Sequence, residues 1–298
     1  MEKEELDSYL RAGKIASSAL QLGKKLAKPG ATLLGIAEAV ESHIREQGAK
    51  PAFPANLSAN DLAAHYTPET GDASTIGEKD VLKIDVGAHI NGFIADTALT
   101  VDFSGENGKL LEASEKALEA ALSIAKPGIK IAELGAAVES EIKLLGFRPI
   151  ENLSGHLLGK YELHAGLEIP NIRTNDSRTL EEGQAIAIEP FATNGAGRVG
   201  EGQKVEIFSL LEARPTRMRE ARRMLSFIQS HYGTLPFAER WLAKEFPSGF
   251  MRTAALKDLV LSTSLEQYPV LRDVKGGLVS QFEHTMLVES GGCRITTR

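Results

Sequence analysis

Two aspartates lie in the apolar segment KIDVGAHINGFIADTALT, residues 83–100, where charged side chains are unusual. Aspartate is a poor strand former, and an unpaired carboxylate is costly to bury. The Asn91-Gly92 pair between two apolar runs predicts a β-hairpin with a two-residue type I′ loop. In the register that this loop sets, Asp85 and Asp96 point to the same face as diagonal neighbours, with Cα atoms roughly 7–8 Å apart.

Two carboxylates at that distance repel each other unless a positive charge lies between them. A divalent metal ion is the most economical source of that charge. The alternative is a pair of strand-end aspartates that face solvent. The hairpin alone does not decide between them, so further ligands must be sought elsewhere in the chain.

Three more candidate ligands lie in apolar or strand-like surroundings. His156 lies in NLSGHLLGKYELHAG, Glu189 in AIAIEPF and Glu283 in LVSQFEHTMLV. Glutamates in apolar strands are rarely buried without a partner. Taken singly, each glutamate could be exposed on an edge strand, and the histidine could be a hydrogen-bonded structural residue.

Together the candidates offer four carboxylates and one imidazole. Structural zinc prefers cysteine and histidine in a closed tetrahedron, so this set does not suit it. It suits two hard to borderline divalent ions such as Mn²⁺, Fe²⁺ or Co²⁺. Two such ions about 3.5–4 Å apart hold a water between them and lower its pKa. The chemistry that this set predicts is therefore hydrolysis.

An internal repeat indicates how the chain positions these residues. AKPGATLLGIAEAVES begins at Ala27 and AKPGIKIAELGAAVES begins at Ala125, an offset of 98 residues. Each segment is typical of a turn, with proline beside a helix start, followed by an amphipathic helix. Chance similarity between two amphipathic helices is the alternative. The matched ends at constant offset favour a duplicated unit.

The similarity extends beyond the helices. NLSAN at 56–60 meets NLSGH after a two-residue slip, which gives His156 the place of Asn60. Strand-like runs follow in each half, DVLKID ending at Asp85 and QAIAIE ending at Glu189. Duplication predicts two similar halves that face each other about a pseudo-twofold axis, with a cleft between them. The two strand-end acids would face that cleft from opposite sides.

Composition and charge exclude several classes of protein. The 298 residues are 42% hydrophobic and 25% charged, as in an ordinary globular protein. The net charge of −6 and the lack of a basic stripe give no reason to expect nucleic-acid binding. The single cysteine, Cys293, excludes an internal disulfide framework. The acidic start MEKEELDSYL is unlike a signal peptide, and no run of about 18 apolar residues predicts a membrane span. We therefore expect a cytoplasmic protein, and nothing demands more than a monomer.

The five candidate ligands, in this order and setting, resemble those of the methionine aminopeptidases and their relatives with the pita-bread fold. That wider group includes the proline-specific aminopeptidases and the prolidases. The resemblance is closest to the type II methionine aminopeptidases in four stretches: FPANLSANDLAAHYTP, KIDVGAHINGFIADTA, SGHLLGKYELHAGLEIPN and QFEHTMLV. Without the long charged N-terminal extension of the eukaryotic enzymes, the chain looks like the compact archaeal form.

The resemblance implies an α+β pita-bread fold, with duplicated halves around a central antiparallel sheet. A single catalytic domain, 1–298, would consist of an N-terminal half at about 1–124 and a C-terminal half at about 125–298. A helical insertion that is typical of type II enzymes is expected at 213–272. RMREARRMLSFIQSHYG and LPFAERWLAKEF read as its helices.

The resemblance also assigns site residues. The metal ligands would be Asp85, Asp96, His156, Glu189 and Glu283. They would hold two divalent ions, Co²⁺, Mn²⁺ or Fe²⁺ with Zn²⁺ as a further candidate, and Asp96 and Glu283 would bridge them.

The catalytic residues would be His65, His164 and Glu189. His65 matches the family histidine over the scissile bond, which fumagillin-type epoxides alkylate, and His164 the one that contacts the substrate carbonyl. Both histidines would contact substrate, and the methionine pocket would add Phe53, Leu163 and Tyr268. The other histidines have no expected role: His43, His89, His231 and His284. His284 should face the opposite side of its strand from Glu283.

The implied reaction is removal of the N-terminal methionine from nascent proteins when the next residue is small, by attack of a metal-bridging water. The partners would be N-termini of nascent polypeptides near the ribosome. One alternative is a proline-directed aminopeptidase or prolidase on the same scaffold. Another is a catalytically inactive binding protein, although such relatives lose metal ligands and all five are present here.

Overall fold

The structure is a computed structural model that describes residues 1–298. No helix combines the length and the apolar character that crossing a membrane requires. The helices are α1 (Lys3–Leu26), α2 (Leu33–Glu46), α3 (Gly108–Ile124), α4 (Ile131–Leu144), α5 (Arg219–His231), α6 (Glu239–Leu242) and α7 (Gly249–Leu261).

The strands form three sheets, and the largest is the expected central antiparallel sheet. It has nine strands in the order β1-β4-β5-β15-β9-β7-β8, with β2 paired to β4 and β16 paired to β15. These strands are β1 (Lys50–Pro51), β2 (Asn56–Ala59), β4 (Val81–Ile90), β5 (Phe93–Asp102), β7 (Ser154–Leu158), β8 (Glu168–Pro170), β9 (Ala185–Ile188), β15 (Glu283–Glu289) and β16 (Gly292–Ile295).

Two smaller sheets complete the fold. One has the order β14-β10-β6 and the other has the order β12-β11-β13-β3. Their strands are β3 (Leu62–Ala64), β6 (Arg148–Pro149), β10 (Phe191–Thr193), β11 (Val199–Leu210), β12 (Phe237–Ala238), β13 (Leu265–Asp273) and β14 (Val279–Gln281).

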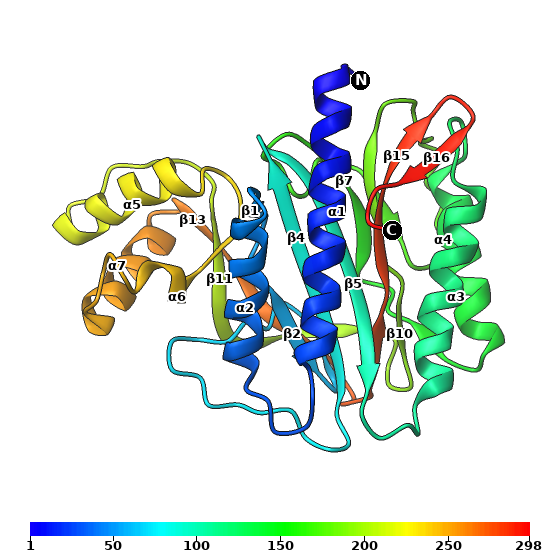
Figure 1. The fold of residues 1–298 in the computed structure, drawn as a ribbon, viewed down its shortest axis with the longest axis horizontal. Coiled ribbons are helices and arrows are strands. Elements are labelled where there is room, and N and C mark those ends of the chain that lie inside the picture. The colour runs from blue at the N-terminus through cyan, green and yellow to red at the C-terminus, as the bar shows by residue number, and fades with distance from the viewer.

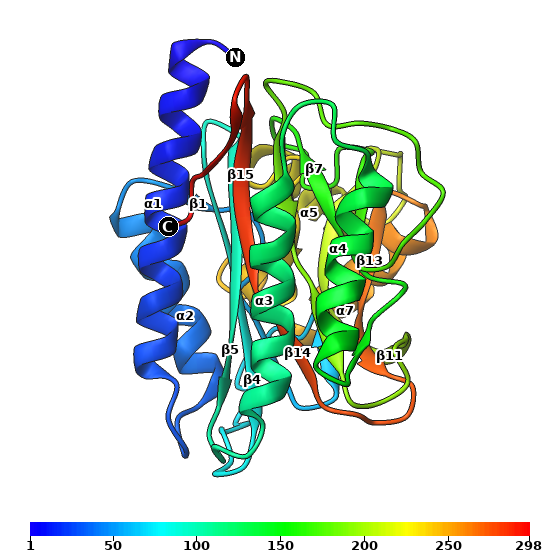
Figure 2. The ribbon, with the colours of Figure 1, turned by 90° about the vertical axis from the view of Figure 1, so that its right-hand side faces the viewer.

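Two helix pairs cover the central sheet. The pair α1–α2 packs with β4 and β5, and the pair α3–α4 packs with β8, β9 and β15, each around its own apolar cluster. Figure 2 shows the two pairs side by side along the sheet. This arrangement confirms the α+β architecture that the sequence predicts.

The duplication is visible in matched backbone hydrogen bonds. The turn glycines of the two AKPG motifs, Gly30 and Gly128, both have a left-handed φ, of 84° and 83°. The amide of Gly30 donates to the carbonyl of Ile76, and the amide of Gly128 donates to that of Leu180, both at 2.8 Å. The same turn therefore connects the helices of each pair and ties them to an equivalent following segment.

The second repeat unit starts earlier than the boundary at 124/125 that the sequence indicates. α3 packs on α4 as α1 packs on α2, so α3 is the counterpart of α1 and the unit begins near Gly108. The sequences of α1 and α3 have diverged, and recognisable similarity begins only at the turn that follows them.

The strand register also corrects the alignment of NLSAN with NLSGH. Ser58 lies opposite the residue two positions before Asp85, and His156 lies opposite the residue two positions before Glu189. His156 is therefore the counterpart of Ser58, not of Asn60. The offset of 98 residues continues without a slip, and the shared letters NLS do not mark equivalent positions.

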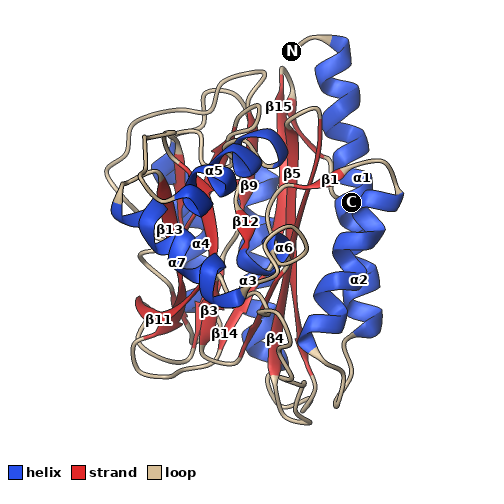
Figure 3. Ribbon diagram, turned by 90° about the vertical axis from the view of Figure 1, so that its left-hand side faces the viewer, coloured by secondary structure: helices blue, strands red, loops and turns tan.

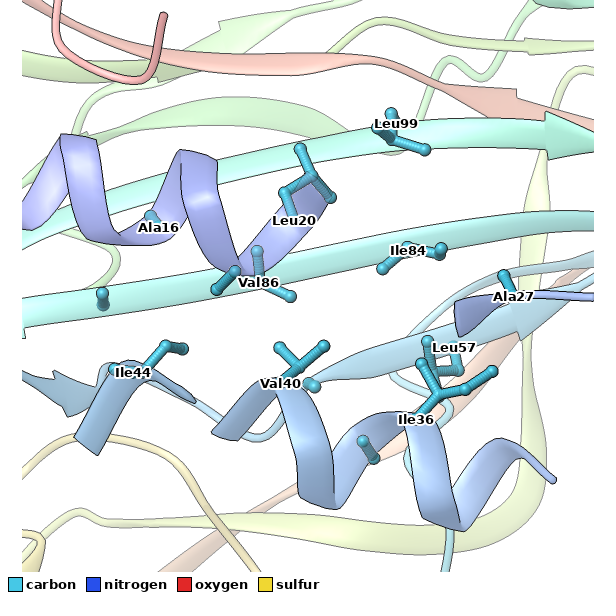
Figure 4. Packing of buried hydrophobic residues seen from close by; sticks show 14 of the residues in the cluster. Ala16, Leu20, Ala27, Ile36, Val40, Ile44, Leu57, Ile84, Val86 and Leu99 are labelled. Carbon is cyan, nitrogen blue, oxygen red and sulfur yellow. The ribbon is translucent and has the colours of Figure 1, made fainter. Parts of the chain in front are cut away.

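Small residues bring α1 close to the β4–β5 hairpin. Ala12, Ala16 and Ala19 on α1 are fully buried, and Figure 4 shows Leu20 and Val40 packed over Ile84 and its strand neighbours. The short side chains on this face of α1 leave room against the sheet. Larger side chains from the strands fill that room. The hairpin that carries both aspartates thus has a well-packed apolar backing.

The helices α5–α7 form a separate lobe with its own apolar cluster, on the opposite side of the molecule from α3 and α4 in Figure 1 and facing the viewer in Figure 3. α5 confirms the first predicted helix of the 213–272 segment. The second prediction is largely wrong, because Phe237 and Ala238 pair with β11 and only four residues, Glu239–Leu242, are helical. The segment also contains α7 and, from Leu265, strand β13.

Candidate metal centre

The hairpin has the predicted loop and register. Asn91 and Gly92 have left-handed φ angles of 54° and 90°, as a type I′ loop requires. Asp85 pairs with Ala98, and Asp96 pairs with Gly87. The two aspartates therefore share a face. Asp85 lies in the middle of β4 rather than at a strand end, which corrects that part of the prediction.

The other three candidate ligands come from neighbouring strands of the same sheet. Glu283 opens β15 and lies opposite Ala98, the residue that Asp85 faces from the other side. His156 lies in β7. Glu189 follows the last residue of β9 and precedes Pro190, which cannot donate to a ladder. The sheet thus brings together side chains from both repeat units.

The distances place these side chains around one centre. His156 Nε2 is 3.7 Å from Asp96 Oδ2 and 3.7 Å from Glu189 Oε1. One donor atom each of Asp96, His156 and Glu283 lies within 4.8 Å of the others. All three residues are buried, with Glu283 only 1% exposed.

Several carboxylate oxygens at this centre have no hydrogen-bond partner in the protein. They are Asp85 Oδ1, Asp96 Oδ1 and Glu283 Oε1, all buried. Buried polar atoms are normally paired, and an unpaired buried carboxylate is especially costly. Cations bound among these oxygens would remove that cost, so the residues present fit a divalent metal site.

The pKa values also show that the charged carboxylates are unfavourable at this centre without a cation. Burial raises the pKa of Asp85 to about 7. Burial first, and neighbouring carboxylates second, raise the pKa of Asp96 and of Glu283 well above their usual values. Burial lowers the pKa of His156 to about 3, which favours the neutral imidazole that a metal requires. A divalent cation would reverse the preference of the carboxyls for their neutral form.

All the predicted site residues line one cavity of about 610 Å³. Its lining includes Phe53, His65, Asp85, Asp96, His156, Leu163, His164, Glu189, Tyr268 and Glu283.

The two proposed catalytic histidines lie on the walls of this cavity. His65 has a left-handed φ of 64°, a strained conformation typical of functional sites. Its Nδ1 lies 3.2 Å from the carbonyl oxygen of Pro269, and burial lowers its pKa to about 4. The ring of His164 lies 4.6 Å from that of His156, and burial lowers its pKa too. Both imidazoles are therefore neutral near pH 7.

The expected methionine-pocket residues come from three different parts of the chain. Phe53 follows β1 and packs against Gly87, where an added Cβ would lie 2.2 Å from Phe53 Cε1. Leu163 lies in the turn after β7. Tyr268 lies in β13, and its ring lies 5.5 Å from that of His65. They bring apolar and aromatic surface to the same cavity as the carboxylates.

One residue of the centre, Gln281, is not among those that the sequence predicts. Gln281 Nε2 donates to Glu189 Oε2 at 3.1 Å and to Glu283 Oε2 at 3.4 Å. Its place two residues before Glu283 was the available signal, because alternate strand residues share a face. His284, by contrast, faces away from the centre as predicted, with Nδ1 2.8 Å from Thr297 Oγ1.

Comparison with known proteins gives the family. A family model described as metallopeptidase family M24 matches residues 7–289. A methionine aminopeptidase of Pyrococcus horikoshii is 51% identical over 294 residues, covering 98% of this chain and 99% of that protein. One of Archaeoglobus fulgidus is 49% identical over 298 residues and covers both chains fully.

Solved structures share the fold. One described as a thermophilic Arx1 has a TM-score of 0.87 at 20% identity, covering 99% of this chain and 91% of that chain. A methionine aminopeptidase from Thermotoga maritima has a TM-score of 0.73 at 23% identity, covering 100% and 98%. A prolidase from Pyrococcus furiosus has a TM-score of 0.64 at 21% identity, covering 100% of this chain and 64% of that chain. These likenesses confirm the pita-bread fold.

Proposed function

The chain belongs to metallopeptidase family M24, and we propose that it removes the N-terminal methionine from polypeptides whose second residue is small. The relatives named methionine aminopeptidase are about half identical over nearly the whole chain. The observation that carries the proposal is the convergence of four carboxylates and one imidazole at one cavity, which two neutral histidines also line.

Two divalent ions would be held by Asp85, Asp96, His156, Glu189 and Glu283. Bound there, the ions would supply Lewis acidity and lower the pKa of a water molecule. We propose Co²⁺, Mn²⁺ or Fe²⁺, with Zn²⁺ as a further candidate, because carboxylates and imidazole suit these ions.

Glu189 is our candidate for the general base. Gln281 fixes its Oε2, and its Oε1 faces His156, so the carboxylate has a defined orientation at the edge of the cluster. A base must lie within hydrogen-bond reach of the proton it takes, and a fixed carboxylate beside the reacting water meets that condition.

The two wall histidines would act on the peptide bond. Neutral His164 can donate a hydrogen bond to the substrate carbonyl, where negative charge develops. His65 lines the same cavity, and its Nδ1 is directed to the Pro269 carbonyl, which leaves Nε2 for the substrate. It would hand a proton to the leaving amine or stabilise the intermediate.

Phe53, Leu163 and Tyr268 would form the pocket for the methionine side chain. A flexible thioether packs well against aromatic rings and fills irregular apolar space. The segment 213–272, which we interpret as the insertion typical of type II enzymes, contributes Tyr268 and would limit access from that side.

We also propose the setting of the reaction. The substrates would be N-termini of nascent polypeptides near the ribosome, and the enzyme would act as a monomer in the cytoplasm. Nucleic-acid binding is not needed for this role, and the net charge of −6 gives it no support.

The rival function is cleavage of Xaa-Pro bonds, because the prolidase shares the fold. The discriminating experiment is a cleavage assay with metal-stripped protein to which each divalent ion is added back. We expect release of methionine from Met-Ala-Ser and no release from Xaa-Pro peptides. Preference for Xaa-Pro would replace the proposal with the rival, and failure to cleave either peptide with any of the four ions would indicate an inactive binding protein.

A further inference from the structure

The motif AVES, which ends the matched segment in each repeat unit, contains a glutamate: Glu41 in α2 and Glu139 in α4. Their surroundings differ sharply. The side chain of Glu139 is 23% exposed and contacts Lys143 and the amide of Arg173 near the surface. The side chain of Glu41 is only 3% exposed. Glu41 is therefore a buried carboxylate outside the metal centre, and its burial requires other partners.

Glu41 receives hydrogen bonds from two distant parts of the chain. Its Oε1 accepts from the guanidinium Nη2 of Arg240 and, at 3.1 Å, from the amide of Ala55. Its Oε2 accepts from Trp241 Nε1 at 2.7 Å. Arg240 and Trp241 belong to α6, which lies beside α2 in Figure 1. Glu41 therefore joins the first repeat unit to the lobe that contains α5–α7.

The other end of Arg240 continues the connection. Arg240 Nη1 donates to Thr67 Oγ1 at 2.7 Å and to the carbonyl of Pro68 at 3.2 Å. Thr67 Oγ1 in turn donates to the carbonyl of Ala55 at 2.8 Å. Glu41, Ala55, Thr67 and Arg240 thus form a closed ring of hydrogen bonds, which we call the α2–α6 ring.

The α2–α6 ring holds both segments that carry proposed substrate contacts from the first unit. Phe53 lies two residues before Ala55, and His65 lies two residues before Thr67. Both line the cavity, whereas no side chain of the ring does. His65 also has a left-handed φ, a conformation that persists only when the surroundings fix it. The ring supplies such a constraint on the following residues.

We propose that Glu41 and Arg240 are positioning residues. They fix the Phe53 and His65 walls of the cavity relative to the metal centre, and so set the fit for the first substrate residue. This inference rests on the proposed function. It adds that the α5–α7 lobe acts on specificity through a buried ion pair, whereas Tyr268 reaches the cavity from the neighbouring strand β13.

The test compares steady-state kinetics of Glu41→Gln with Glu139→Gln, its counterpart in the other repeat unit. Substrates are Met-Ala-Ser and Leu-Ala-Ser, because a displaced wall should reduce discrimination between methionine and leucine. We expect Glu41→Gln to lower kcat/KM for Met-Ala-Ser roughly 10- to 100-fold, the effect of about 1 Å of misplacement. The preference for methionine should fall with it. Glu139→Gln should stay within about twofold of wild type, because its exposed ion pair contributes little.

Two further variants keep the test decisive if Glu41→Gln does not fold. Thr67→Val opens the α2–α6 ring without burying a charge, and Thr67→Ser retains the hydroxyl. We expect Thr67→Val to lose preference for methionine and Thr67→Ser to keep most of it, with equal metal content in both.

Unchanged kinetics in the ring variants would overturn the inference. So would a loss of equal proportion for both peptides, because that would indicate a merely structural role. Failure of wild-type protein to cleave Met-Ala-Ser would instead count against the proposed function, so the two failures are distinguishable.

Discussion

The strands β4 and β9, which lead to Asp85 and Glu189, differ in length and in how they hold these acids. β4 and β5 have ten residues each, joined by a tight turn and paired along their whole length. β9 and β10 have four and three residues and are separated by Glu189 and Pro190. Asp85 is therefore fixed by a continuous ladder, whereas Glu189 lies in a gap and is oriented by Gln281.

This difference suggests a division of labour between the repeat units. A carboxylate in a rigid, well-packed strand suits a permanent metal ligand. A carboxylate outside the ladder, held by one side-chain hydrogen bond, suits a group that must also exchange a proton. The duplication thus supplies two similar scaffolds, and the position of Glu189 beyond the end of β9 distinguishes their chemistry.

The largest expected effect is on turnover, from the acid in the gap. Glu189→Gln should lower kcat on Met-Ala-Ser by roughly 10²- to 10⁴-fold, the usual contribution of general base catalysis. Circular dichroism should show an intact fold. Exposed Glu182→Gln, seven residues earlier, is the matched control and should retain full activity. Near wild-type turnover in Glu189→Gln would remove Glu189 from the role of base.

A second prediction compares the two residues that the strand register makes equivalent. His156→Ala should weaken binding of Mn²⁺ or Co²⁺ by at least roughly tenfold, because even partners of a metal ligand have effects of that size. Ser58→Ala should leave binding unchanged. Isothermal titration of metal-stripped protein measures both. Equal affinities in all three proteins would show that His156 is no ligand.

The third prediction concerns how the acid in the gap is held. Gln281→Met removes the amide that bonds Glu189 and Glu283 while keeping a side chain of similar size. We expect about a tenfold loss of kcat/KM, as for other partners of metal ligands. A pH profile should separate this from loss of fold, because the titration of the base should move while the melting temperature stays within a few degrees. An unchanged profile would mean that Gln281 does not orient Glu189.

The smallest effect concerns the tight turn that joins β4 to β5. Gly92 N donates to His89 Nδ1 at 3.2 Å, so His89 must be neutral there. Burial lowers the pKa of His89 from 6.5 to about 4. The folded state thus disfavours protonation, and the contribution of His89 to stability is complete above pH 6.5 and lost as the pH falls towards 4.

The size of that contribution is up to about 3 kcal/mol, because one pKa unit corresponds to about 1.4 kcal/mol and burial lowers the pKa from 6.5 to about 4. Urea unfolding of wild type and His89→Gln at several pH values measures it. The difference between the two free energies of unfolding should shrink or reverse between pH 7 and pH 4. A difference that does not change with pH would show that His89 ionises equally in both states.

How much the sequence predicts depends on the range of the interaction. The Asn91-Gly92 loop sets the hairpin register through local geometry, so the shared face of Asp85 and Asp96 follows from the residues alone. The repeat offset indicated the turn and the second helix of each pair, α2 and α4, but not α1 and α3, whose sequences have diverged. Matching letters were a poorer guide than strand pairing, as the alignment of His156 with Asn60 shows.

Interactions across long separations were not predictable. Glu41 and Arg240 are 199 residues apart, and nothing in either local sequence indicates a buried pair. LPFAERWLAKEF has helical composition, yet pairing with β11 keeps Phe237 and Ala238 extended. Tertiary context overrides local propensity in such segments.

In the proposed centre, acids from both repeat units and one imidazole hold a pair of cations. Anomalous scattering from crystals grown with Mn²⁺, recorded at the manganese edge, tests it most directly. We expect two peaks about 3.5–4 Å apart, within bonding distance of Asp85, Asp96, His156, Glu189 and Glu283. Peaks elsewhere in the molecule, or none at these five side chains, would contradict it.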